Sequence, residues 1–149
     1  MSFEVNFPDD FLAELLDADF DKIAAEALQD SAPVMEKALK ESCRRAVEHE
    51  GDSELVESIR AAKPKKSKNG AWILNVGPRG YSKTKVYYKT LKRGRHSYPV
   101  SNALKAIWKE YGIYGQQPPR PFITSAINSV RNDVLEKIQE AYNRRTGVN

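Results

Sequence analysis

The feature that most constrains the fold is a helical repeat of apolar residues at the carboxyl end of the chain. From Phe122 to Tyr142, apolar side chains recur at intervals of three and four residues for about six helical turns. The same spacing appears near the amino end, in residues 20–30 and again in residues 34–48, after a shorter helical pattern in residues 9–16. The sequence therefore predicts long amphipathic helices at both ends of the chain.

Pro33 separates the two longer amino-terminal stretches. Proline fits comfortably only in the first turn of a helix, because it lacks the N–H group that an interior position donates. We therefore expect one helix to end near Asp30 and a second to begin with Ser31 as its cap; a kinked continuous helix is the alternative. A shorter helical stretch begins at Ser53.

The middle of the chain has the pattern of strands and turns. Residues 71–76 are rich in β-branched and aromatic side chains, which predicts a strand, and residues 86–88 are a second candidate. Ser101 is placed to cap a helix that ends at Gly112. A stretch rich in Gly and Pro then leads to the last helix.

Together these patterns predict an α+β fold in which long amphipathic helices at both ends pack on a small antiparallel β-sheet. The length of 149 residues suits one domain, so we expect residues 1–149 to form a single domain. Within it, residues 1–18 would form an amino-terminal arm, and residues 63–70 and 81–98 would form basic loops or hairpin tips. No apolar run reaches the roughly 18–20 residues that span a bilayer, so we expect no membrane partner.

Charge is distributed unevenly along the chain. Residues 1–57 hold 16 acids and five bases, whereas residues 58–109 hold 14 bases and no acid. The net charge of +4 hides this separation. Such a pattern points to an electrostatic partner, either a nucleic acid or an acidic protein surface, including that of another copy of the chain.

In the basic segment, Lys and Arg are interleaved with Trp72, Tyr81, Tyr87, Tyr88 and Tyr98. Proteins that bind the nucleic-acid backbone use this mixture to neutralise phosphates and to stack on bases. In the alternative interpretation, the aromatic residues belong to the core and the lysines are simply solvated. The candidate interface or DNA-facing charges are Lys63, Lys65, Lys66, Lys68, Arg79, Lys83, Lys85, Lys92, Arg93 and Arg95.

The sequence contains no clear motif for a catalytic, metal-binding or phosphate-binding site. Neither His49 nor His96 lies in a metal-binding or catalytic pattern, and Cys43 lies on an apolar helical stripe, where a thiol is usually a core residue. The turn at residues 77–80 follows a strand but lacks the Lys-Ser/Thr pair of a phosphate-binding loop. We therefore expect no catalytic residues, no metal and no cofactor, and we expect that the protein is not an enzyme.

Four motifs occur in a fixed order along the chain. GDSELVESI occupies residues 51–59, and the basic run KPKKSKNG at residues 63–70 leads into an aromatic strand. KEYG at residues 109–112 then precedes PRPFITSA at residues 119–126, which opens the last amphipathic helix. Over about residues 20–145 this order resembles the head–tail joining (neck, tail-completion) protein family of long-tailed bacteriophages and prophages.

The resemblance implies a structural protein without enzymatic activity that acts in virion assembly at the junction of head and tail, commonly as an oligomeric ring. Its partners would be other phage neck or tail proteins and further copies of the chain. It would be found in the host cytoplasm during assembly and then in the virion. Contacts between neighbouring copies could pair the acidic helical face with the basic face; alternatively, the chain is a basic module that contacts DNA through residues 58–109. The residues that would fix the turn before the final helix are Glu110, Tyr111, Gly112, Pro119, Pro121 and Phe122.

Overall fold

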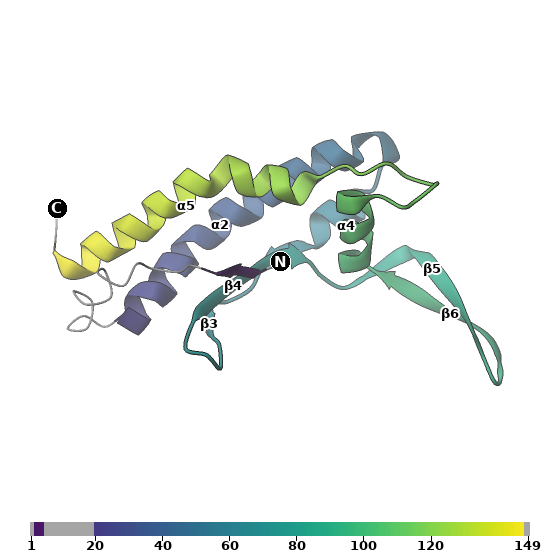
Figure 1. The fold of residues 1–149 in the computed structure, drawn as a ribbon, viewed down its shortest axis with the longest axis horizontal. Coiled ribbons are helices and arrows are strands. Elements are labelled where there is room, and N and C mark those ends of the chain that lie inside the picture. Colours follow the sequence, from purple (N-terminus) through teal and green to yellow (C-terminus); the bar gives the residue numbers. More distant parts are fainter. Residues whose placement is uncertain (1, 5–19, 148–149) are drawn as a thin grey trace. The chain divides into compact units, whose positions relative to one another are not determined.

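The computed structural model describes residues 2–4 and 20–147, which have an α+β fold (Figure 1). A long helix in the amino-terminal region, α2 (Phe20–Val47), and another at the carboxyl end, α5 (Phe122–Thr146), are separated in the sequence by small antiparallel sheets. The predicted fold class is therefore confirmed. The helical pattern in residues 9–16 and most of the arm expected in residues 1–18 lie outside the described residues.

The other described elements are short, apart from one hairpin. In chain order they are β1 (Ser2–Glu4), the 3-10 helix η1 (Glu48–Glu50), α3 (Ser53–Ser58), β2 (Ile59–Ala61), β3 (Lys65–Lys66), β4 (Trp72–Pro78), β5 (Tyr81–Leu91), β6 (Gly94–Ser101) and α4 (Asn102–Tyr111).

The chain forms two compact units, each built from separate segments. One unit, here the helical unit, consists of Met1–Ala38, Ala61–Val76 and Ile127–Asn149. The other, here the hairpin unit, consists of Leu39–Arg60 and Gly77–Ala126. The single domain expected from the chain length stays a prediction.

The expected break before Pro33 is wrong, because α2 continues through this residue without interruption. Ser31 does not cap a helix; its hydroxyl is buried and donates to the Ala27 carbonyl one turn earlier, at 2.7 Å. Pro33 itself is exposed, while Ala32 and Leu39 are buried. Burial of this continuous apolar stripe offsets the roughly 3 kcal/mol that an interior proline costs a helix.

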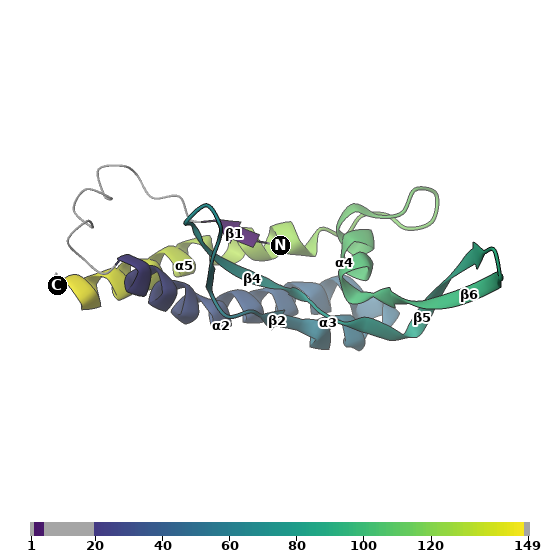
Figure 2. The same ribbon diagram turned by 90° about the horizontal axis from the view of Figure 1, so that it is seen from below.

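The core of the helical unit lies between α2 and α5, which run side by side in both ribbon views (Figures 1 and 2). Ala27 of α2 is buried with Val134, Ile138 and Ala141 of α5, and partly buried side chains pack against this group. The small side chains of Ala27 and Ala141 leave room for the larger residues beside them. The apolar period read from the sequence is therefore the packed face of α5.

A small sheet completes the helical unit. Within this unit, strand β4 pairs antiparallel with β1 and with β3. The β3–β4 register places Lys65 opposite Ile73 and Lys66 opposite Trp72. Residues 63–70 thus form one arm and the tip of a β-hairpin.

The hairpin unit contains a second sheet, made of β5 and β6 alone. Tyr81 lies opposite Ser101 and, after an irregularity in the register, the antiparallel pairs run without interruption from Val86 opposite Pro99 to Leu91 opposite Gly94. Helix α4 follows β6 directly, and the Ser101 hydroxyl accepts from the Leu104 N–H at 3.1 Å, which confirms the predicted cap. The side chains of residues 39–60 that are buried in this unit include Cys43, at 0% exposure, which confirms its expected core position.

Candidate interaction surface

The β5–β6 hairpin has two faces because side chains alternate along a strand and cross-strand partners share a face. Tyr87 and Tyr98 are directly opposite each other, and their rings stack with centroids 5.5 Å apart and planes at 26°. Lys89 and His96 form another pair two residues closer to the tip, on the same face as the tyrosines. This face therefore combines aromatic rings with basic side chains.

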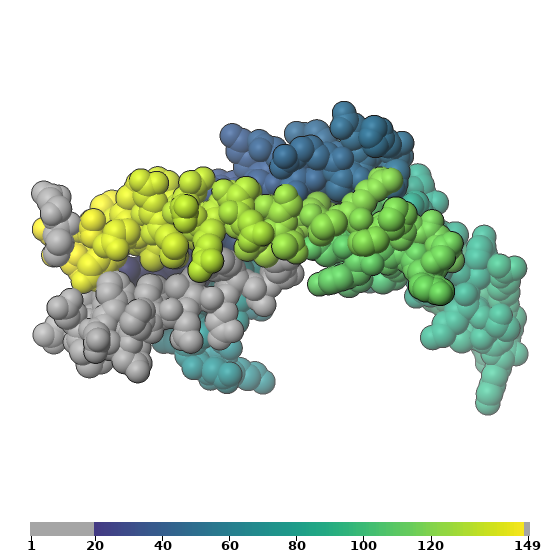
Figure 3. All heavy atoms as spheres, turned by 45° about the horizontal axis from the view of Figure 1, so that its top comes forward, coloured from purple at the N-terminus to yellow at the C-terminus, as the bar shows by residue number. Residues whose placement is uncertain are grey.

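The opposite face carries Tyr88 and Arg95. The Arg95 guanidinium lies 4.1 Å from the centroid of the Tyr88 ring, which is close enough for a cation–π interaction. Tyr88 is nevertheless 58% exposed. Every residue from Lys83 to Ser97 is exposed, and the hairpin extends away from α4 (Figures 1 and 3). Within the described chain, both faces of the hairpin are therefore open to solvent.

Exposed apolar surface is concentrated in the hairpin unit. Of the nine large hydrophobic residues that are exposed in the described chain, eight lie between residues 81 and 114. The ninth, Leu135, lies on α5 in the helical unit. The eight are Tyr81, Val86, Tyr87, Tyr88, Leu91, Ile107, Tyr111 and Tyr114. Clustering of this kind is typical of a surface that another molecule covers.

The ten basic residues predicted as interface charges are all exposed. The structure divides them between the two units: Lys63, Lys65, Lys66 and Lys68 lie in the helical unit, and the other six lie in the hairpin unit. Lys66 is already engaged, because its ammonium bonds both carboxylate oxygens of Asp21, at 2.8 and 2.6 Å.

The described part of the acidic segment, residues 20–57, is largely neutralised within the chain. Of the ten carboxylates in the described residues 20–57, seven accept a hydrogen bond or form an ion pair inside their own unit. In the helical unit these are Asp21, Glu26, Asp30 and Glu36; in the hairpin unit they are Glu50, Asp52 and Glu54.

Two lysines of α4 have a structural role that sequence reasoning missed. The Lys105 ammonium lies 2.8 Å from Asp52 and 3.3 Å from Glu54, and Lys109 pairs with Glu50. Both lysine side chains are nearly buried, at 3% and 4% exposure. Two sequence patterns could have indicated this role. The lysines are four residues apart, which puts them on one face of a helix, and every second residue from 50 to 54 is acidic.

These contacts lower the pKa values of two of the acidic groups, Glu50 and Glu54. The hydrogen bond from Lys109 lowers the pKa of Glu50 against the opposing effect of burial. The pKa of Glu54 is also lowered, first by the backbone N–H of Lys83 and then by Ser82 and Lys105. Both carboxylates are thus held in the charged form that the lysines require.

The turn before α5 is built around a buried carboxylate. Glu110 accepts from the backbone N–H groups of Ile123 and Thr124, at 2.8 and 3.1 Å, and from the Thr124 hydroxyl at 2.7 Å. These bonds satisfy the first donors of α5 and place a negative charge at its amino end. Gly112 has φ +76°, and a Cβ there would lie 2.6 Å from the Gln117 carbonyl oxygen.

The remaining residues predicted for this turn differ in burial. Phe122 is buried at 2% exposure, whereas Pro119 and Pro121 are exposed. Tyr111 is 76% exposed, so its side chain belongs to the exposed apolar surface.

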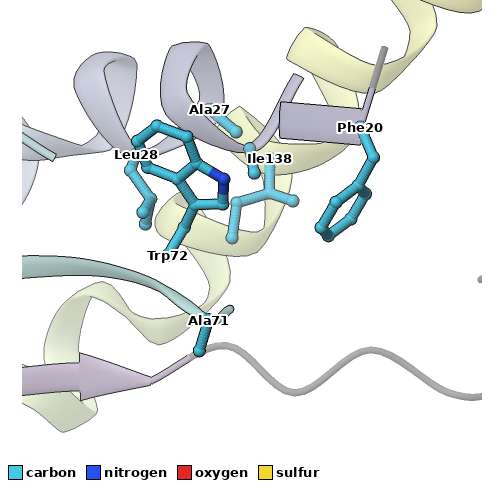
Figure 4. A pocket seen from close by; sticks show the side chains of 7 residues that line it. Phe20, Ala27, Leu28, Ala71, Trp72 and Ile138 are labelled. Carbon is cyan, nitrogen blue, oxygen red and sulfur yellow. The ribbon is translucent and has the colours of Figure 1, made fainter. Parts of the chain in front are cut away.

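A small apolar pocket lies in the helical unit (Figure 4). The indole ring of Trp72 lies beside Leu28 and Ala27, with Ile138 behind, and the enclosed space is about 60 Å³. Pockets for small-molecule ligands are typically about 300–1,000 Å³, so this space is a packing gap at the edge of the core. The indole N–H donates to Asp21 at 3.0 Å, and the pKa of Asp21 is lowered by Lys66 and by this bond.

The other candidate chemical groups are placed as follows. Burial raises the pKa of the Cys43 thiol to about 12, so the thiol is protonated at neutral pH. His49 is exposed on η1. In residues 2–4 and 20–147, no group of three or more His, Cys, Asp or Glu side chains is arranged to hold a metal ion, and no helix is long and apolar enough to cross a membrane.

Comparisons with protein families, characterised proteins and solved structures find no match to this chain.

Proposed function

We propose that this chain is a non-enzymatic structural protein of the head–tail connection of a phage or prophage, a neck or tail-completion protein that acts in virion assembly through protein–protein contacts. The observation that carries the proposal is the concentration of exposed large hydrophobic side chains in residues 81–114 of the hairpin unit. The ordered sequence motifs that resemble the head–tail joining family supply the biological setting.

The physical argument rests on the cost of leaving this surface uncovered. An isolated two-stranded hairpin is at best marginally stable in water, and the β5–β6 sheet has no third strand among the described residues. Tyrosines are enriched in protein interfaces because they bury a large area while keeping a hydroxyl for hydrogen bonding. A partner that docks on this unit would bury its exposed apolar surface, and the same contact would stabilise the hairpin.

A stripe on α4 provides the clearest protein-binding element. Ile107 and Tyr111 are four residues apart, so they lie on one face of the helix, and Tyr114 follows in the next loop. Their exposures are 51%, 76% and 104%. We assign this stripe to contacts with other neck or tail proteins or with the next copy in a ring, formed in the host cytoplasm and kept in the virion.

The experiment replaces the stripe in a phage or prophage that carries this gene. The variant Ile107→Ser/Tyr111→Ser/Tyr114→Ser removes only exposed side chains, so its circular dichroism and urea midpoint should match the wild type. It should leave filled heads and separate tails in lysates viewed by electron microscopy. Leu135→Ser is the control, because Leu135 is as exposed as Ile107, at 51%, but lies in the helical unit. Normal virions from the stripe variant would overturn the proposal.

A further inference from the structure

We infer that the β5–β6 hairpin binds the phosphate backbone of double-stranded nucleic acid. This inference goes beyond the proposed assembly function and concerns the basic side chains of the hairpin, whereas the assembly test changes only the α4 stripe. Residues 83–95 contain six Lys or Arg side chains and no carboxylate, and all six are exposed. They are Lys83, Lys85, Lys89, Lys92, Arg93 and Arg95. A surface of this charge attracts a polyanion.

The carboxylates of residues 20–57 are poor candidates for the partner. Seven of the ten in the described residues 20–57 already have bonds inside their own unit. A second copy that offered its acidic segment to the hairpin would have to break those bonds. Nucleic acid instead brings regularly spaced charges that are free to exchange their counterions for Lys and Arg.

The hairpin has the dimensions of a two-stranded β-ribbon that fits into a groove of duplex DNA. Six residue pairs, from Val86 opposite Pro99 to Leu91 opposite Gly94, give it a length of about 20 Å. The major groove of B-DNA is about 12 Å wide and admits a two-stranded β-ribbon. Two adjacent cations, Lys92 and Arg93, form the turn at its tip, and Gly94 has the φ of +119° that the turn requires.

The aromatic residues favour a duplex over a single strand. Single-strand binders stack bases on open aromatic faces. Here the rings of Tyr87 and Tyr98 stack on each other, and Arg95 covers the ring of Tyr88. These contacts occupy one face of each ring, which leaves less open aromatic surface on which the bases of a single strand could stack.

Fluorescence anisotropy with a labelled random-sequence DNA duplex tests the inference on the full chain. The test variant Lys89→Gln/Lys92→Gln/Arg93→Gln removes three hairpin charges that form no ion pair within the described residues. The matched control Lys63→Gln/Lys65→Gln/Lys68→Gln removes three exposed charges from the helical unit. Circular dichroism confirms that both variants fold.

The wild type and the control should bind equally, and the hairpin variant should bind at least about tenfold more weakly at about 50 mM salt. Between about 50 and about 200 mM salt, the slope of log K against log salt should be shallower by about 2–3 for the hairpin variant than for the wild type. The reason is that each phosphate contact on duplex DNA contributes about −0.9 to this slope. Absence of wild-type binding at the lower salt would overturn the inference, as would equal weakening of both variants.

Two further binding measurements distinguish a duplex from other polyanions. Tighter binding of the single strand than of its duplex would overturn the assignment of a duplex. Polyglutamate that competes as well as duplex would show that the partner is an acidic protein surface, which also overturns the inference. The α4 stripe variant should bind duplex normally, so failure of virion assembly and failure of DNA binding are distinguishable.

Discussion

In the helical unit, ion pairs lie at the surface, whereas in the hairpin unit two of the lysines that form ion pairs, Lys105 and Lys109, are buried. Lys66 and Asp21 have side chains that are 47% and 54% exposed, and Arg144 pairs with Asp30 while more than half exposed. Lys105 is 3% exposed and depends on Asp52 and Glu54 for its partners. The helical unit is held by an apolar core that has charges around it, and the hairpin unit has charges as part of its interior.

This difference decides what each charge contributes. Exposed ion pairs gain little, because water and salt screen them and two long side chains lose freedom. A buried ammonium that loses its carboxylate has no water to replace it, so removal of one partner is costly. The same residue types therefore predict large effects in one unit and small effects in the other.

The largest effect is expected for Asp52→Ala. This change leaves the buried Lys105 ammonium with Glu54 alone, 3.3 Å away, and removes the oxygen that caps α3 by accepting from the Leu55 N–H. The free energy of unfolding should fall by about 3 kcal/mol. Urea denaturation followed by circular dichroism measures this. Glu57→Ala on the same helix is the control, because Glu57 is exposed. Equal losses in the two variants would refute an interior role for the charge.

The next effect is expected at the cap of α5. Glu110→Ala leaves the backbone N–H groups of Ile123 and Thr124 without their acceptor. We expect a loss of about 2 kcal/mol in the free energy of unfolding, and a smaller loss for Glu110→Gln, which keeps one acceptor oxygen. Urea midpoints of the two variants compare these directly. A Gln variant as unstable as the Ala variant would show that the carboxylate charge matters more than the hydrogen bonds.

A smaller effect is expected from pH. The pKa values of Glu50 and Glu54 are lowered in the folded state, so their stabilising contribution is complete above the ordinary value of 4.5 and is lost as pH falls through the lowered folded pKa. The urea midpoint should therefore fall with pH below that value. Glu50→Gln should reduce this dependence on pH. An unchanged slope in this variant would contradict the pairing of Glu50 with Lys109.

The smallest effect is expected for Arg144→Ala in the helical unit. Arg144 bonds Asp30 and lies near Glu26, but its side chain is 55% exposed. Exposed pairs of this kind are screened by solvent, so the urea midpoint should change far less than in Asp52→Ala, and added salt should reduce the change further. A loss as large as that of Asp52→Ala would remove the distinction between the two units.

Much of the local structure could be predicted from the sequence. The apolar period from Phe122, the cap at Ser101 and the strand in residues 71–76 all agree with the structure, because each depends on neighbours a few residues away. The helix break predicted at Pro33 is wrong because that prediction also considered only near neighbours in the sequence. Its local preference for a helix start was overridden by burial of the stripe that includes Ala32 and Leu39.

The candidate site was predicted less completely. All ten predicted basic residues are exposed, but their division between the two units was not visible in the sequence. The extent of the β5–β6 hairpin was also missed, since only residues 86–88 of its eleven-residue first strand had a clear strand pattern. Cross-strand pairs such as Tyr87 with Tyr98 stabilise this hairpin, and such pairs form between distant positions.

The sequence by itself determined the α+β class, the helical ends and the separation of acidic from basic segments. Periodicity, caps and charge counts are properties of short stretches, which can be read directly. Only the tertiary structure decided which charges are neutralised: Lys105 and Lys109 became interior partners of acids more than fifty residues away, while the hairpin cations stayed in solvent. The physical reason is that the energy of a charge depends on its distance from other charges and on its burial, and the folded chain sets both.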